Sequence, residues 1–78
     1  MSQKDLEGNV GAPEDSKVKE VYVEEGKKVT KGQALMKLNS FGKDIIIESP
    51  VDGTVSKLEV TSETNVIKDE LLVDIFPK

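Results

Sequence analysis

The chain has 78 residues, a net charge of −4 and an aromatic content of 4%, and it contains no Cys, His or Trp. The missing residue types exclude disulfide bonds, thiolate or imidazole metal sites and a histidine general base. The acidic balance and the scarcity of aromatic rings disfavour nucleic acid, which binds basic and stacking side chains. At this length we expect one small domain.

The sequence gives no sign of a membrane segment. No apolar run approaches the length of a membrane span, and the first residues lack the hydrophobic core of a signal peptide. We therefore expect no membrane insertion and a cytoplasmic location. The acidic side chains are scattered, which is typical of a solvated surface.

The first half of the chain predicts a tail followed by short strands. Residues 1–11 are polar and without periodicity, so we expect a flexible N-terminal tail before a folded domain over residues 12–78. Residues 17–23 have the β-branched and aromatic content of a strand. A turn at Gly26, a short return strand, a second turn and a strand over residues 34–39 then lead to a central hairpin.

The second half repeats this alternation of strands and turns. Residues 45–47 are three consecutive isoleucines, which predict a strand buried on both faces or one that passes between the two sheets. Residues 56–60 form a further predicted strand. Glu63 stands where the first half has Gly26, so we expect the following turn to use Asn65 or a different geometry. Since no stretch has a helical period of useful length, the fold class is all-β.

An internal repeat with a spacing of 37 residues runs through the chain. Two halves, about 12–40 and 49–77, align without a gap on either side of a hairpin over residues 41–48. Seven positions are identical in the two halves, namely Pro13, Asp15, Val18, Val23, Val29, Lys31 and Leu35 with their partners. Two copies are too few for a solenoid and indicate interlocked halves related by a pseudo-twofold axis. About eight short strands then predict a flattened barrel or sandwich of two similar sheets.

The central hairpin connects the two halves. We predict Gly42-Lys43 as the central pair of a type II′ turn, because the first central residue of that turn needs a positive φ. This turn would place Lys43 at the tip, with its amine in solvent.

These features together resemble the biotinyl/lipoyl carrier (attachment) domain family. The similarity rests on Ala-Pro at 12–13, Val-Tyr-Val-Glu-Glu-Gly-Lys-Lys-Val at 21–29, Lys-Gly-Gln-Ala-Leu at 31–35 and Ser-Pro-Val-Asp-Gly-Thr-Val at 49–55. It covers residues 12–76 and implies a barrel-sandwich hybrid of two four-stranded antiparallel sheets. It also implies a lysine at the tip of the central hairpin, to which a ligase joins biotin or lipoate as a swinging arm.

The attachment hairpin departs from the family pattern. Biotinyl members carry a Met-Lys-Met tip and lipoyl members an Asp-Lys-Ala tip, whereas ungapped alignment places Gly42 at the modified lysine. Phe41 falls on the preceding position and Lys43 on the following one, and neither Phe41 nor Asp44 fits either subfamily. Lys43 is therefore the candidate attachment residue, shifted by one position, with Phe41, Gly42 and Asp44 beside it at the hairpin tip.

Two functions remain open from the sequence. The first is a non-catalytic carrier that presents a prosthetic group on Lys43 for transfer between active sites of a multienzyme complex. Biotin is slightly favoured over lipoate, because residues 49–53 look closer to biotinyl members. The partners would be a biotin or lipoate ligase and the subunits of that complex. The second is an unmodified scaffold or interaction module that has lost the lysine register and binds an unidentified protein.

An enzyme is not expected. Adjacent carboxylates such as Glu24 and Glu25 point to opposite faces of an extended chain and do not converge as an acid/base pair. The serines have no evident base to activate them.

Overall fold

The computed structural model describes residues 8–77, which form eight β-strands and no helix. The strands are β1 (Asn9–Gly11), β2 (Ser16–Val21), β3 (Lys28–Val29), β4 (Ala34–Ser40), β5 (Lys43–Glu48), β6 (Gly53–Leu58), β7 (Asn65–Val66) and β8 (Leu71–Pro77). They form two four-stranded sheets with the orders β1-β8-β6-β3 and β5-β4-β2-β7, and every pairing is antiparallel. The predicted all-β fold of two sheets is confirmed.

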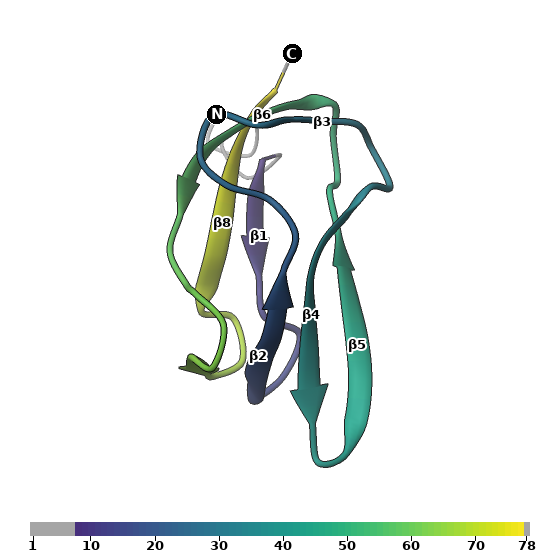
Figure 1. The fold of residues 1–78 in the computed structure, drawn as a ribbon, viewed down its shortest axis with the longest axis vertical. Coiled ribbons are helices and arrows are strands. Elements are labelled where there is room, and N and C mark those ends of the chain that lie inside the picture. Colours follow the sequence, from purple (N-terminus) through teal and green to yellow (C-terminus); the bar gives the residue numbers. More distant parts are fainter. Residues whose placement is uncertain (1–7, 78) are drawn as a thin grey trace.

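A pseudo-twofold axis relates the two sheets. Replacing each strand by the one four places along the chain converts the order β1-β8-β6-β3 into β5-β4-β2-β7. In addition, β2, β3 and β4 begin and end 37 residues before β6, β7 and β8. Figure 1 shows the β4–β5 hairpin at one end of the molecule and the C-terminal end of β8 at the other. The repeat in the sequence is therefore also a repeat in space.

The identical apolar positions of the repeat form the centre of the core between the sheets. Val18 and its partner Val55 are 0% and 1% exposed, and Leu35 and Leu72 are both fully buried. Two more matched pairs are buried with them, Val23 with Val60 and Val29 with Val66. Complete burial of such a side chain contributes roughly 1.5–3 kcal/mol. Four of the seven identities between the halves therefore lie in the core between the sheets.

The repeated aspartates tie each half to the other. The Lys68 backbone N–H donates to Asp15 Oδ1 at 2.9 Å, and the Lys31 backbone N–H donates to Asp52 Oδ1 at 2.7 Å. Each carboxylate thus satisfies a backbone donor in a turn of the opposite half, where the main chain has left its strand. This reciprocal bonding explains why Asp is retained in both copies.

The prediction of a flexible tail over residues 1–11 is wrong for residues 9–11. Residues 9–11 form β1, which pairs with β8, and Val10 is only 9% exposed and belongs to the core. The Ile75 N–H also donates to the Gly8 carbonyl at 2.7 Å. A strand of three residues with one inward apolar side chain is too short to show periodicity in a sequence. The rest of the predicted tail, residues 1–7, lies outside the described residues.

The isoleucines of β5 are not buried on both faces as predicted. Ile47 is 8% exposed, whereas Ile46 is 47% exposed. The physical reason is that each sheet has one face on the core and one face in solvent, and Ile46 lies on the outer face of β5. Figure 1 shows β5 at the outside of the molecule beside β4.

Candidate functional site

The turn between β4 and β5 has Phe41 and Gly42 as its two central residues. Ser40 pairs with Lys43, so the strands meet one residue earlier than the sequence predicted. Phe41 has φ of 51° and Gly42 has φ of 84°, and two positive values identify a type I′ turn. The predicted type II′ turn over Gly42-Lys43 is therefore wrong. Lys43 is the first residue of β5 and lies directly after the tip.

The Asn39 side chain holds this turn. Its Oδ1 accepts a hydrogen bond from the Gly42 N–H at 3.2 Å, and its Nδ2 donates to Asp44 Oδ1 at 3.0 Å. Asn39 and Asp44 are direct cross-strand partners. One amide therefore joins the end of β4 to the turn and to the start of β5.

Ser40 anchors the base of the hairpin to the body of the domain. Its side chain is 2% exposed, and its Oγ donates to the Asp15 carbonyl oxygen at 2.9 Å. The same Asp15 accepts from Lys68 through its carboxylate. The hairpin base is thus connected to the contact that joins the two halves.

The four predicted site residues lie together on this hairpin and are all exposed. Phe41 has 98% of its surface exposed, and the Lys43 side chain is also in solvent. The pKa of the Asp44 carboxyl is lowered, mainly by the hydrogen bond from Asn39 and further by the positive charges of Lys37 and Lys19, against a smaller opposing effect of burial. The hairpin therefore presents an aromatic ring and an amine beside a carboxylate that stays ionised.

The tip of the hairpin presents its polar and aromatic side chains to solvent. Within residues 8–77, no cluster of three or more Asp, Glu, His or Cys side chains could hold a metal ion. Those residues also include no helix long and apolar enough to cross a membrane. An exposed lysine amine on a rigid hairpin can be acylated, and the cofactor so attached would supply the chemistry.

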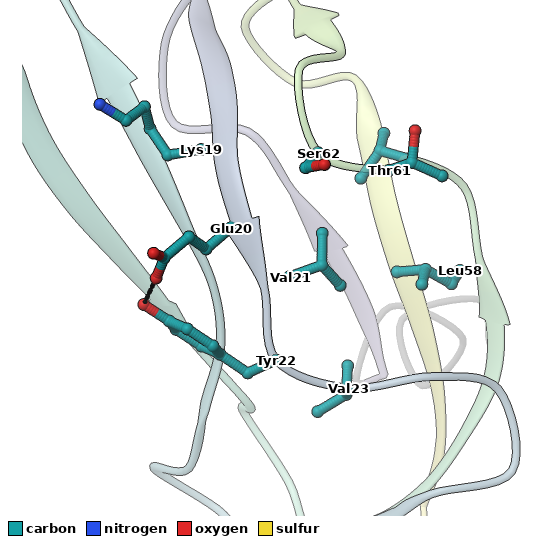
Figure 2. A pocket seen from close by; sticks show the side chains of 9 residues that line it. Lys19, Glu20, Val21, Tyr22, Val23, Leu58, Thr61 and Ser62 are labelled. Atoms are coloured by element: carbon teal, nitrogen blue, oxygen red, sulfur yellow. Dashed lines mark hydrogen bonds between the residues drawn. The ribbon is translucent and has the colours of Figure 1, made fainter.

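A separate open pocket lies between the ends of β2 and β6. Figure 2 shows the Tyr22 hydroxyl donating to Glu20 Oε1 on one side of this pocket, at 2.8 Å. This hydrogen bond raises the pKa of the Tyr22 phenol, and burial and the charge of Glu20 add to the effect. Val21 and its repeat partner Leu58 also line the pocket. Glu20 is the single carboxylate in the lining.

Sequence reasoning missed Asn39 and Ser40, which shape the hairpin. Asn is a frequent turn residue because its side chain bonds backbone groups two or three positions on, and this was the available signal. The Ser40 contact could not be found in this way, because its partner Asp15 is 25 residues away in the chain.

Comparison with known proteins finds a matching family model and several related carboxylases. The family model Biotin_lipoyl, described as "Biotin-requiring enzyme", matches residues 7–75. The mitochondrial pyruvate carboxylases of Rattus norvegicus and Homo sapiens are each 39% identical to this chain over 72 residues. Pyruvate carboxylase 1 of Caenorhabditis elegans is 35% identical over 72 residues. In each case the match covers 92% of this chain but only 6% of the relative.

Two solved structures share the fold. A single-chain, multi-domain long-chain acyl-CoA carboxylase matches with a TM-score of 0.84 and 20% identity, over 90% of this chain and 7% of that one. The lipoyl domain of the 2-oxoglutarate dehydrogenase complex from Azotobacter vinelandii matches with a TM-score of 0.77 and 16% identity, over 88% of this chain and 95% of that one. The chain therefore belongs to the biotinyl/lipoyl domain family, whose members carry covalently attached biotin or lipoate and are not catalysts by themselves.

Proposed function

We propose that this chain is a biotin carrier domain, with biotin joined by an amide bond to the side-chain amine of Lys43. The main support for the proposal is the exposed Lys43 directly after the turn of the β4–β5 hairpin, in a domain of the carrier family. The identity with pyruvate carboxylases favours biotin over lipoate. The partners would be a biotin ligase and the active sites of a carboxylase complex.

The chain's own contribution would be a rigid support for the attached group. Lys43 would hold biotin through an amide bond at its Nζ. When attached, biotin would supply carboxyl-group transfer. The Ser40 and Asn39 bonds would hold the attachment point at one end of the domain, which raises the effective concentration at two separated active sites.

A second function, an unmodified interaction module, is supported by the tip itself. Ungapped alignment with the family pattern puts Gly42 at the modified lysine. The neighbouring Phe41 is 98% exposed with a positive φ. A fully exposed aromatic ring on a fixed turn suits insertion into an apolar pocket of a protein partner. In this function Lys43 would stay unmodified.

The intact mass of the protein after co-expression with a biotin ligase separates the two functions. A gain equal to one biotinyl group, abolished by Lys43→Arg, would establish the carrier. A parallel expression with a lipoate ligase tests the other cofactor. Absence of a gain with either ligase would overturn the carrier proposal.

The double variant Gly42→Lys with Lys43→Arg is the positive control. A Cβ at Gly42 meets no atom within 4 Å, so the backbone conformation is the remaining obstacle to lysine there. A mass gain in this variant, with none in the wild type, would show that the ligase recognises the domain and that the lysine register alone prevents modification. That result would favour the interaction module.

A further inference from the structure

We infer that Asn39 is a positioning residue, which selects the register of the β4–β5 hairpin and thereby decides where Lys43 is presented. The selection of the register is a property of the fold. Its consequence for biotin attachment rests on the function proposed above.

A second register of this hairpin keeps the same alternation of faces. Moving the turn by one residue, from Phe41-Gly42 to Gly42-Lys43, shifts the pairing of β5 against β4 by two residues. A shift of two residues preserves the alternation of faces, so the apolar pattern does not reject it. Leu38, which now pairs with Ile45, would then face Ile47. The alternation of faces alone therefore does not discriminate between the registers at the tip. Farther from the tip, the Ser49 N–H bond to the Gln33 carbonyl at 2.9 Å also favours the observed register.

Backbone preference favours the register that is not observed. The type I′ turn places Phe41 at φ of 51°, a conformation that non-glycine residues avoid. A type II′ turn with Gly42 first would need a positive φ at a glycine alone. Another interaction must therefore hold Phe41 in its present conformation.

The Asn39 side chain supplies that interaction. Its bonds to the Gly42 N–H and to Asp44 Oδ1 both require the observed register, because Asn39 would face Ile46 after the shift. Asp44 would then pair with Phe41 instead of Asn39. Ser40 adds a fixed point below the turn through its bond to the Asp15 carbonyl, but it does not contact the turn residues. Asn39 thus couples the conformation of the tip to the position of Lys43.

The experiment compares wild type with Asn39→Ala by solution NMR of the whole chain. In a two-residue hairpin the residues flanking the turn form a hydrogen-bonded pair, so wild type should show a cross-peak between the amide protons of Ser40 and Lys43. Asn39→Ala should weaken that cross-peak, speed exchange of the Gly42 amide proton and raise the pKa of Asp44 toward its ordinary value. Unchanged spectra around residues 40–44 would overturn the inference.

Conservative variants separate positioning from a general loss of structure. Asp44→Asn keeps an oxygen acceptor for Asn39 Nδ2 and should preserve the cross-peak, whereas Asp44→Ala should weaken it. Asn65→Ala is a matched control, because Asn65 also pairs with Lys17 in the same sheet but lies on β7, away from the turn. Asn65→Ala should leave the hairpin signals unchanged. Equal effects of Asn39→Ala and Asn65→Ala would refute a specific role.

The consequence for modification is read from ligase kinetics. Asn39→Ala should change kcat/KM for biotin attachment at Lys43 by about fivefold or more, since the shifted register would move the lysine from the first residue of β5 onto the turn. Asp44→Ala should change kcat/KM in the same direction, and Asp44→Asn should stay close to wild type. An altered register with an unchanged kcat/KM would refute the link to attachment. If wild type is not modified at all, the proposed carrier function fails, and the NMR comparison still decides the role of Asn39 in the register.

Discussion

Glu63 takes the backbone conformation that Gly26 takes in the other half of the molecule, with φ of 73° and 94°, respectively. Asp69 matches Gly32 in the same way, with φ of 71° and 88°. The turn over residues 61–65 therefore keeps the geometry of its repeat, and the left-handed residue is Glu63 rather than the expected Asn65. The second half carries side chains at two positions where the first half has glycine, and L residues rarely adopt this conformation.

Replacing Asp69 with Gly should raise the free energy of unfolding by about 0.5–1 kcal/mol. Glycine adopts a positive φ without the steric conflict of a Cβ. Urea unfolding followed by circular dichroism would measure the change. Gly32→Ala is the matched control and should lower stability by about 1 kcal/mol, since a Cβ there meets no neighbour and only the backbone is tested. A destabilised Asp69→Gly protein would contradict the assigned strain.

Lys17→Gln should move the pKa of Glu63 back up toward its ordinary value. In the native protein Lys17 Nζ lies 2.9 Å from Glu63 Oε1, and that hydrogen bond and charge lower the carboxyl pKa, with a smaller contribution from Lys19. A lowered folded pKa means that the stabilisation is present above the unfolded pKa of Glu and is lost as the pH falls through the folded pKa. Carbon-detected NMR titration of Glu63 measures the shift directly.

The same ion pair gives a pH test of stability. The side chains of Lys17 and Glu63 are 50% and 68% exposed, so solvent screens the pair and the effect should be small. Wild type should exceed Lys17→Gln in stability at neutral pH, and the difference should vanish in acid below the folded pKa of Glu63. Lys57→Gln, on β6, is the control and should leave the Glu63 titration in place. A difference that grows in acid would contradict the assignment.

Leu72→Ala should lower the free energy of unfolding by about 2–5 kcal/mol, because Leu72 is fully buried and its removal leaves a cavity. Leu35→Ala, at the matching position of the first half, should lower it by a similar amount. Ile46→Ala should cost less than about 1 kcal/mol, because that side chain is 47% exposed on the outer face of β5. Equilibrium denaturation of the three variants is the measurement. A loss at Ile46 equal to that at Leu72 would show that β5 is covered on both faces.

Gly53→Ala should destabilise the domain by about 1–3 kcal/mol. A Cβ at this position would collide with the carbonyl group of Phe76 on the paired strand β8, and backbone cannot yield as a flexible side chain can. The matching residue of the first half is Ser16, so Ser16→Ala serves as the control with an expected loss below about 1 kcal/mol. Thermal unfolding of both variants would compare them. A neutral Gly53→Ala would show that β6 and β8 separate easily at this end.

The sequence by itself determined the class of fold and the plan of the core. Alternating apolar residues and turn signals are local features, and both occur in each copy of the 37-residue repeat. The two sheets and the pseudo-twofold axis therefore followed from the sequence pattern. The matched positions Leu35 and Leu72 are both buried. The location of the candidate site on the central hairpin followed from the family motifs. The repeated Asp15 and Asp52 were visible as identities, although their reciprocal bonds to the opposite half were not.

Only the tertiary structure decided the details that depend on what lies beside each strand. Ile46 is exposed because it lies on the outer face of its sheet, and Val10 is buried because β1 pairs with β8. Local periodicity does not specify which strands pair. The turn at Phe41-Gly42 is accompanied by the cross-strand contact of Asn39 with Asp44, and the hairpin base is held by the long-range bond from Ser40 to Asp15. These contacts join residues whose pairing cannot be predicted from local sequence patterns. In the structure Lys43 lies one residue after the tip instead of on it.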